Sequence, residues 1–328
     1  MRRIGEFELI ARFTRAFAGG EGVRVGIGDD AAVLRPPPGA ELVATVDAVV
    51  EGVHAGPGFS PEDLGWKSLA VNLSDVAAMG ARPLWALVAL ATPPAEDPRR
   101  LVRIGRGIAA CARRYGTAVV GGNVTSAAQV SVTVTVVGAV ARGRALLRSG
   151  GRPGDLLVVS GHLGDAALGL RPGAARPLWA RQRRPRPRVA LGQAAVGVAR
   201  AAIDVSDGLL QDLGHLCEAS GTGARVELAR LPLSAAYRAA TRGDRDPFEA
   251  ALSGGEDYEL VLAVPPGRLE ALRRAARATR TPVTMIGALE ARRGIRVETA
   301  GGGRYRPRRV GHDHLRSGRV LGPRAGRA

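Results

Sequence analysis

The first half of the chain alternates apolar and polar residues with the periods of both helices and strands. Helical spacing predicts helices over residues 5–18, 60–79 and 97–115, and short apolar or alternating runs predict strands over 41–46, 83–92, 117–120 and 130–136. The helix over 60–79 has the clearest limits, because Ser60 can cap its start and Gly80 can end it. We therefore expect a first α/β domain at residues 1–140.

The second half repeats this mixture of periods after a turn-rich connection. Strands are expected over 156–160, 202–204, 225–228, 258–264 and 283–286, and helices over 163–170, 189–200, 208–216 and 268–277. Residues 171–188 are rich in Arg and Pro, a composition that predicts an exposed loop. Residues 150–315 thus form a second expected α/β domain, followed by a basic tail at 316–328. The sequence predicts a two-domain α/β (α+β) fold.

A polar stripe runs along the helix expected over 60–79. Ser68, Asn72 and Asp75 lie at positions i, i+4 and i+7, so they share one side of the helix. A stripe of this kind is compatible with a solvent-facing surface. The rest of the helix is apolar nearly all round, which indicates burial, and a buried Asp requires a partner. A metal ion is one candidate for that partner.

The run Gly26–Val33 places Asp29 and Asp30 side by side in a glycine-rich turn. Its glycines match the loose dinucleotide-binding pattern, in which the turn opens a helix that receives the pyrophosphate. Prolines within residues 35–39 prevent a helix from following, and two carboxylates would repel a pyrophosphate. Asp47, at the expected end of the strand over 41–46, lies at the usual distance of the ribose-binding acid but lacks that helix. A shared cation explains the paired acids better.

Composition excludes several classes of protein. The net charge of +17 comes almost entirely from scattered arginines, since Lys67 is the single lysine, so we do not expect nucleic acid as a partner. No uncharged apolar run reaches about 18 residues, which predicts no transmembrane helix and no membrane partner. No secretory signal is recognisable at the start. Cys111 and Cys217 lie in helix-like apolar stretches, which argues against a disulfide and for a cytoplasmic location.

Several acids end expected strands or lie in small-residue turns, and they come from both halves of this basic chain. They are Asp29, Asp30, Asp47, Asp75, Asp204, Asp207, Glu256 and Asp257. Carboxylates without a cluster of Cys or His favour a hard cation, Mg²⁺ before Zn²⁺, and Mg²⁺ usually bridges to substrate phosphates. The pattern indicates nucleotide-dependent phosphoryl transfer, although unrelated helix caps and turn acids would also fit it.

The residues that would hold ATP do not follow the P-loop pattern. Lys67 is followed by Ser68 but lacks the preceding glycine spacing, and no kinase-type glycine loop precedes a lysine strand. Metal ions, helped by arginine, would then neutralise the phosphates. Phosphoryl transfer depends on positioning and charge neutralisation more than on covalent chemistry, so such a site is sufficient.

Five motifs in this order resemble the thiamine-monophosphate kinase family of the aminoimidazole ribonucleotide synthetase superfamily. They are Gly26–Ala31, the strand end at Asp47–His54, Lys67–Gly80, Asp204–Leu209 and Ser253–Leu260. The resemblance extends from Gly5 to about Leu315. It implies two α/β domains, with N-terminal domains that pair as a β-barrel homodimer. It also implies direct transfer of the γ-phosphate of ATP to thiamine monophosphate, with several Mg²⁺ ions and no phosphoenzyme.

Carried over motif by motif, the resemblance implies roles for individual residues. Mg²⁺ ligands would be Asp30, Thr45, Val46, Asp47, Asp75, Asn123, Asp204 and Asp207. Contacts to ATP would come from Tyr115, Gly122, Arg148 and Ser206, and contacts to thiamine monophosphate from His54, Glu256 and His312. The family motifs assign no residue a purely catalytic role here.

Three positions depart from the family pattern. Asn123 replaces the usual Asp, so it offers a carbonyl oxygen but no negative charge. Val46 replaces a Thr and offers only its backbone. His312 replaces an aromatic residue that packs on the thiamine, and its smaller ring buries less area. We expect these changes to affect affinity first.

Two other functions fit the same motifs. One is another ATP-dependent enzyme of the superfamily. Selenophosphate-making relatives carry an early Cys, whereas Cys111 is the first here, and hydrogenase-maturation relatives end in a cysteine tail that this sequence does not show. The other is a non-catalytic paralogue that binds nucleotide or thiamine phosphate, for which Asn123 and His312 are the motivation.

Overall fold

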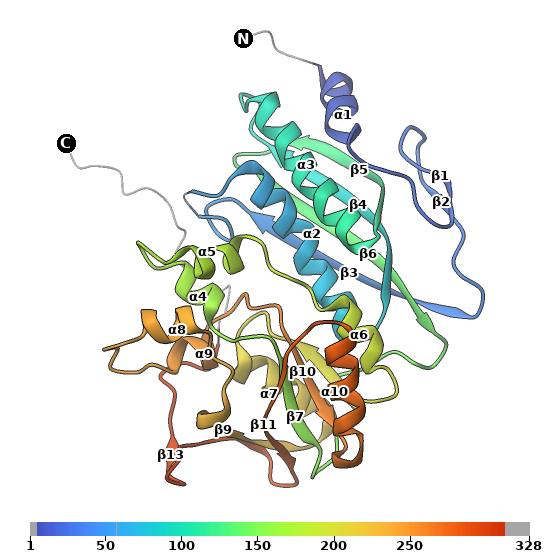
Figure 1. The fold of residues 1–328 in the computed structure, drawn as a ribbon. Helices are drawn as coiled ribbons and strands as arrows, with labels where there is room; N and C mark the ends of the chain where they lie inside the picture. The colour runs from blue at the N-terminus through green and yellow to red at the C-terminus, as the bar shows by residue number, and fades with distance from the viewer. Residues whose placement is uncertain (1–4, 57, 312–328) are drawn as a thin grey trace, which may run out of the picture.

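The computed structural model of the chain describes residues 5–56 and 58–311, and Figure 1 shows two α/β parts stacked one on the other. The N-terminal part contains α1 (Glu6–Thr14), β1 (Val23–Val25), β2 (Val33–Leu34), β3 (Ala40–Val50), α2 (Pro61–Ala78), β4 (Arg82–Thr92), α3 (Pro98–Tyr115), β5 (Ala118–Ser126) and β6 (Ser131–Ala141). Its main sheet has the order β3-β6-β4-β5, and helices α2 and α3 cover one face. The mixed fold agrees with the prediction.

Helix α2 has the start that its sequence predicts. The Ser60 side chain accepts from the Asp63 backbone N–H, and the Asp63 side chain accepts from the Ser60 N–H, which forms a capping box. Gly65 allows α2 to pack closely on α3, because a Cβ there would lie 2.0 Å from the carbonyl oxygen of Ile104. Ser68 and Asn72 are fully buried, so the polar stripe does not face solvent.

Two strands of this sheet are longer than the sequence predicts. The prediction that a strand ends at Asp47 is wrong, because β3 pairs with β6 over its whole length and Asp47 lies opposite Val134. Likewise β5 does not end at Val120, since it continues through Gly122 and Asn123 in parallel pairing with β4. Tertiary pairing extends both strands past the residues that local patterns treat as turns.

The C-terminal part is built on a seven-stranded sheet of order β13-β12-β9-β11-β7-β10-β8. Its elements are β7 (Leu156–Ser160), α4 (Asp165–Gly169), α5 (Arg176–Arg183), α6 (Val189–Ala195), β8 (Ala201–Asp204), α7 (Leu209–Ser220), β9 (Gly223–Glu227), α8 (Ala235–Ala240), α9 (Glu249–Ser253), β10 (Leu260–Val264), α10 (Leu269–Ala278), β11 (Val283–Glu290), β12 (Gly294–Glu298) and β13 (Arg304–Tyr305), with short 3₁₀ turns at Leu228–Arg230 and Pro266–Arg268.

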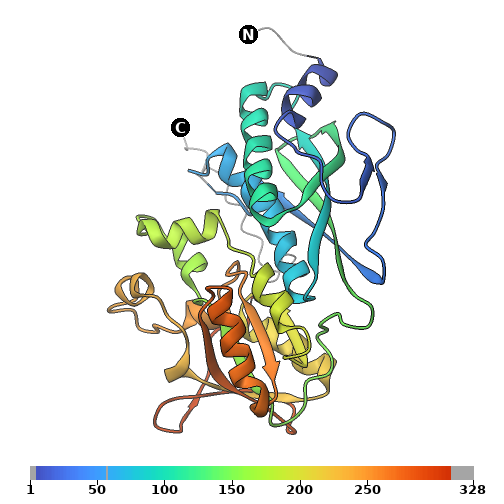
Figure 2. The same ribbon diagram turned by 45° about the vertical axis from the view of Figure 1, so that its right-hand side comes forward.

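The two parts share a hydrophobic core across their boundary. Side chains of β10 alternate, so that Leu260 and Leu262 join the cluster that contains Leu69 of α2, whereas Val261 and Ala263 join a separate cluster with α7. Helix α2 therefore packs on its own sheet and also on the C-terminal sheet, as both views show (Figure 1 and Figure 2). This arrangement fixes the residues of α2 against both parts.

The prediction of an exposed loop over residues 171–188 is wrong. Residues 176–183 form α5, and its Leu178 and Gln182 are buried, as are Pro185 and Pro187 after it. A helix of eight residues with two apolar contacts gives too weak a periodic signal to be recognised among arginines and prolines. The segment packs on α4 and beside α2 (Figure 1).

Two expectations drawn from composition concern cysteines and membranes. Cys111 and Cys217 are free and buried, which confirms the absence of a disulfide. Within residues 5–56 and 58–311, no helix combines the length and apolarity needed to cross a bilayer.

Candidate active site

A cavity of about 560 Å³ lies between the two parts and is lined by side chains from both. Five of the predicted acids reach it: Asp47 from β3, Asp75 from α2, Asp204 from the end of β8, Asp207 from the turn before α7, and Glu256 from the segment after α9. Strands and helices far apart in the sequence thus bring these carboxylates to one place. A pocket of this size and polarity can hold a small phosphorylated substrate.

Hydroxyl groups hold two of these carboxylates in position. The Thr45 hydroxyl donates to Asp75 Oδ2 at 2.6 Å, and the Ser74 hydroxyl donates to Asp204 Oδ2 at 2.7 Å. Ser74 and Asp75 are consecutive residues of α2, so this helix orients one acid and supplies the other. Asp204 is 4% exposed, and water cannot solvate its charge well.

The pocket disfavours negative charge on these acids. Burial first, and then the neighbouring Asp75 carboxylate, raise the pKa of Asp204, whereas the Ser74 hydrogen bond lowers it. Burial also raises the pKa of Asp75, against the Thr45 hydrogen bond and the nearby Arg148. Both carboxylates would ionise more readily beside an added cation.

These shifts predict that the cation-free protein loses stability as pH rises. The folded-state pKa of Asp204 lies above the unfolded value, so its stabilising contribution is complete below about pH 4 and is lost as pH rises through the folded pKa. In thermal unfolding with EDTA, Asp204→Asn should gain stability relative to wild type as pH rises, by about 1.4 kcal/mol per unit of pKa shift. Asp29→Asn, an exposed site, serves as the control; a difference that does not change with pH would contradict the prediction.

The turn before α7 depends on an acid that the sequence analysis did not single out. Asp212 Oδ2 accepts the backbone N–H groups of Ser206, Asp207 and Gly208 at 3.0, 3.0 and 3.1 Å. Gly208 has φ 128°, a conformation that favours glycine. The Asp-x-Ser-Asp-Gly motif is thus shaped by a side chain on the first turn of the following helix. The position of Asp212, four residues after Gly208, was the sequence signal that could have identified this role.

The cavity is also lined by an ion pair that contains a buried lysine. Lys67 Nζ lies 2.6 Å from Glu256 Oε1 and donates to the His54 carbonyl oxygen at 2.8 Å. Gln182 Nε2 of α5 donates to Glu256 Oε2 at 3.1 Å. Lys67 is fully buried, so its charge is compensated inside the protein. The sequence was read for Lys67 as a possible P-loop lysine and as the start of a family motif, but not as an ion-pair partner. Its being the single lysine of the sequence was a signal that it has a specific role.

The segment that carries Glu256 has a strained backbone. Glu256 has φ 71° and Tyr258 has φ 50°, values that non-glycine residues rarely adopt. Asp257, between them, accepts the backbone N–H of Gly164 at 2.6 Å, and the Glu256 N–H donates to the Ser206 carbonyl at 2.7 Å. Strain of this kind is retained where surrounding contacts impose it, and it aims Glu256 at the cavity.

Other predicted site residues lie outside the lining of this cavity. Gly122 and Asn123 line a separate apolar pocket of about 120 Å³ together with Ile27, which belongs to the Gly26–Val33 run. Tyr115 lines a third groove. Asp30 is exposed, and its backbone N–H donates to Asp29 Oδ1 at 2.9 Å.

Three further predicted site residues are Val46, Arg148 and His312. The Val46 side chain points away from α2, on the open face of the sheet, and is 59% exposed. Arg148 is close enough to Asp75 to lower its pKa. His312 lies outside the described residues.

Comparisons with known proteins give one consistent family. The family models of AIR synthase related protein match here, the N-terminal domain over residues 28–140 and the C-terminal domain over residues 152–300. Thiamine-monophosphate kinase of Salmonella typhimurium is 43% identical over 88% of this chain and 91% of its own length. The corresponding kinase of Haemophilus influenzae is 40% identical over 87% of this chain and 89% of its own.

Two solved structures of such kinases superpose on the chain. The thiamine-monophosphate kinase of Stenotrophomonas maltophilia gives a TM-score of 0.82 at 40% identity, covering 90% of this chain and 96% of that one. A second structure, AaThiL complexed with AMPPCP and TMP, gives a TM-score of 0.75 at 32% identity, covering 95% and 99%.

Proposed function

The chain belongs to the thiamine-monophosphate kinase family of AIR synthase related proteins, and we propose that its interdomain cavity is where ATP phosphorylates thiamine monophosphate. Members of the family are ATP-dependent phosphotransferases, and a related structure holds AMPPCP together with TMP. The observation that carries the proposal is the convergence of Asp47, Asp75, Asp204 and Asp207 in one cavity that Glu256 and His54 also line.

Mg²⁺ fits the donors of this cavity. Carboxylate and hydroxyl oxygens are ligands of a hard cation, and Mg²⁺ is typically held by one or two carboxylates plus substrate phosphates. The proposed ligands are Asp47, Asp75, Asp204 and Asp207, which line the cavity, and Asp30, Thr45, the backbone of Val46 and Asn123, which lie outside its lining and are proposed from the family motifs. When bound, the ions neutralise phosphate charge. Within the described residues, no three side chains of His, Cys, Asp or Glu form a ready cage, and a site completed by substrate phosphates needs none.

The chain's own residues would orient the acceptor. Glu256 offers a negative charge to the cationic thiazolium ring of thiamine monophosphate, and its pairing with Lys67 fixes its position. His54 Nδ1 accepts the Val50 N–H at 3.1 Å, so the neutral ring carries its proton on Nε2 and can donate to a phosphate. His312 is proposed as a further contact to the acceptor.

The nucleotide would extend from the cavity toward Gly122. Ser206 lines the cavity and Arg148 lies near Asp75, so both are proposed contacts of the ATP phosphates. The small apolar pocket beside Gly122 suits a base. Tyr115 remains a predicted contact, and it lies in another groove.

We propose direct transfer without a phosphoenzyme. A phosphate oxygen of thiamine monophosphate attacks the γ-phosphorus of ATP, the bond from that phosphorus to the β–γ bridging oxygen breaks, and ADP and thiamine diphosphate leave. Positioning by Glu256, His54 and Arg148 supplies the in-line geometry, while burial of the cavity limits water as a competing acceptor.

A substrate panel tests this function. Purified protein with ATP and saturating Mg²⁺ should form thiamine diphosphate from thiamine monophosphate, and should not turn over thiamine or an aminoimidazole precursor. Turnover of the precursor alone would identify another enzyme of the superfamily. Tight binding of thiamine monophosphate in calorimetry with no product would identify a non-catalytic paralogue.

We also propose that two chains pair through their N-terminal domains, taken as residues 1–140, in the cytoplasm. The face of the β3-β6-β4-β5 sheet away from α2 exposes apolar side chains, among them Leu42 at 51%, Val46 at 59% and Leu87 at 44%. Joining two such faces would close the sheets into a barrel and cover these residues. The free, buried cysteines support the location.

Charge placed on this face should prevent pairing. Leu42→Glu combined with Leu87→Glu is expected to convert a dimer into a monomer, because each pair would bury four uncompensated carboxylates. Light scattering coupled to gel filtration measures the mass. Leu147→Glu, exposed outside this sheet, is the matched control. An unchanged dimer in the double variant would rule out this face.

A further inference from the structure

A second groove, of about 870 Å³, lies between α5 and the helices α2 and α3. It uses a different face of α2 from the candidate active site: Asp63 and Trp66 line the groove, whereas Lys67, Val71 and Asp75 line the cavity. The end of α3 contributes Tyr115 and α5 contributes Trp179. The groove is therefore separate from the proposed reaction site, and Tyr115, a predicted ATP contact, is the one lining residue that the function proposed above involves.

Positive charge in this groove is not balanced by acids. Six arginines line it: Arg114, Arg176, Arg181, Arg183, Arg184 and Arg186. Asp63 is the only acid in the lining, and it pairs with Arg184. Among the described residues, no ion pair joins any of the other five to a carboxylate. Five guanidinium groups thus share one concave surface without carboxylate partners, which favours an anionic ligand.

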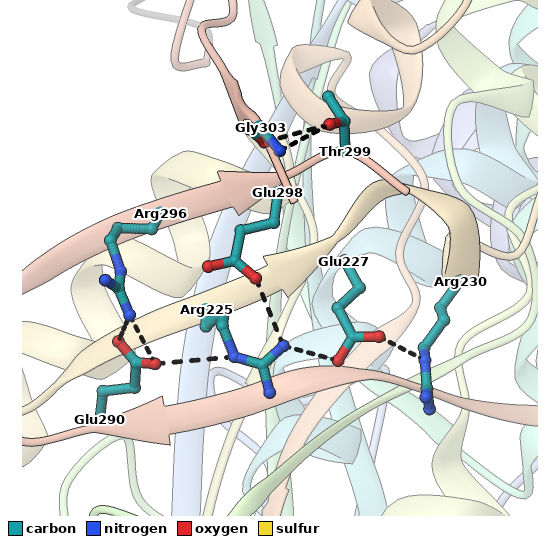
Figure 3. Close-up of polar contacts among 8 residues, drawn as sticks. All are labelled: Arg225, Glu227, Arg230, Glu290, Arg296, Glu298, Thr299 and Gly303. Atoms are coloured by element: carbon teal, nitrogen blue, oxygen red, sulfur yellow. Dashed lines mark hydrogen bonds and ion pairs between the residues drawn. The ribbon is translucent and has the colours of Figure 1, made fainter. Parts of the chain in front are cut away.

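A cluster of arginines elsewhere in the chain has a different arrangement. On the C-terminal sheet, three arginines meet three glutamates in a balanced network (Figure 3). Arg225 contacts Glu227 and Glu290, and Arg296 contacts Glu290. The arginines of this network are accompanied by carboxylates, whereas five of the six that line the groove form no ion pair among the described residues.

Aromatic rings hold the groove's guanidinium groups in place. The Arg183 guanidinium lies 4.3 Å from the centroid of the Trp179 ring, and that of Arg184 lies 5.8 Å from the Trp66 ring. Trp66 is itself fixed, since Nε1 donates to the Pro185 carbonyl at 3.1 Å. Stacking restricts these planes while leaving their N–H edges able to bind, and a planar guanidinium matches phosphate oxygens in pairs.

Other guanidinium groups lie near Arg181 at the edge of the groove. Burial first lowers the pKa of Arg181; the carboxylates of Glu259 and Asp165 raise it, and the neighbouring Arg188 and Arg186 lower it. The Glu259 carboxylate is already engaged by two hydrogen bonds from Arg188. An anion beside Arg181 and Arg186 would relieve this repulsion.

We propose that this groove binds a condensed phosphate chain, present in solution either as inorganic polyphosphate or as the chain of a nucleoside triphosphate. Several guanidinium groups spaced along a groove match a ligand with several linked phosphates better than a single phosphate. The faces of Trp179 and Trp66 are stacked by arginines, so they offer no platform for the successive bases of a nucleic acid strand.

Tryptophan fluorescence provides a direct test, because Trp66 and Trp179 are two of the three tryptophans. The full chain is titrated with sodium tripolyphosphate at constant ionic strength in EDTA, so that the acidic cavity repels the ligand. We expect a saturable change whose Kd weakens by at least about tenfold in Arg181→Gln/Arg186→Gln. Arg274→Gln/Arg277→Gln, exposed on α10, removes the same charge and should bind like wild type.

Competition experiments distinguish the two possible ligands, and further measurements check that the variant is folded. Displacement of tripolyphosphate by ATP would assign the site to nucleotides, and displacement only by long-chain polyphosphate would assign it to the inorganic polymer; both support the proposal. Arg181→Gln/Arg186→Gln should keep its circular dichroism spectrum and its turnover, because neither residue lines the cavity. A signal that does not saturate, or an equal loss of affinity in both double variants, would overturn the proposal.

Discussion

Asp75→Asn is expected to lower the rate of thiamine diphosphate formation by at least about a hundredfold. The carboxylate lies where α2 meets β3, with its Oδ2 held by the Thr45 hydroxyl at 2.6 Å, and it contributes charge to a cavity shared with Asp204. Asparagine keeps the shape and one oxygen but removes the negative charge that would hold Mg²⁺. Steady-state assays across a range of Mg²⁺ concentrations measure the loss.

Asp207→Asn should behave similarly, whereas Asp29→Asn, in the exposed glycine-rich turn, should retain most of its activity. Thermal unfolding of each variant separates loss of metal binding from loss of fold. If Asp75→Asn and Asp207→Asn both turned over at near-normal rates, the proposed assignment of these carboxylates to Mg²⁺ would be wrong.

Lys67→Met is expected to reduce both stability and affinity for thiamine monophosphate. Lys67 is fully buried and its Nζ lies 2.6 Å from Glu256 Oε1, so its removal leaves the glutamate without its main partner. Breaking a buried ion pair typically costs about 3 kcal/mol or more, and the 21% exposure of the Glu256 side chain reduces that figure here. The KM for the acceptor should rise more than the KM for ATP.

A double-mutant cycle with Glu256→Gln isolates the pair. The loss of stability in Lys67→Met/Glu256→Gln, measured by urea unfolding, should be smaller than the sum of the two single losses, because no uncompensated charge remains. Lys67→Arg should not restore wild-type behaviour, since a planar guanidinium does not fit the space of a compact ammonium. Additive effects of the two single changes would show that the contact is not energetically coupled.

Local sequence patterns predicted the features that depend on neighbouring residues, but they did not predict the features that depend on tertiary contacts. The capping box at Ser60 and the stripe of Ser68, Asn72 and Asp75 depend on near neighbours, and both could be read from the sequence. The continuation of β3 past Asp47 depends on β6, and the burial of α5 depends on α4 and α2. Pairing partners distant in sequence override local preference in such cases.

The candidate site shows the same division. Spacing and composition identified a set of eight acids, and five of them line the cavity: Asp47, Asp75, Asp204, Asp207 and Glu256. The ion pair between Lys67 and Glu256 joins residues 189 positions apart, and no local pattern predicts it. Both the acid pattern and the resemblance to the family pointed to Glu256, but neither identified its partner.

Because Lys67 is the single lysine, chemical labelling of its amine can measure how often the two parts of the protein separate. Lys67 belongs to α2 and Glu256 to the C-terminal part, so their contact bridges the two parts, and the amine is inaccessible while it holds. An amine-directed reagent should therefore modify the single lysine side chain only as fast as the bridge separates. The labelling rate at a single atom would then measure the frequency of that separation, and a ligand that spans the cavity should slow it.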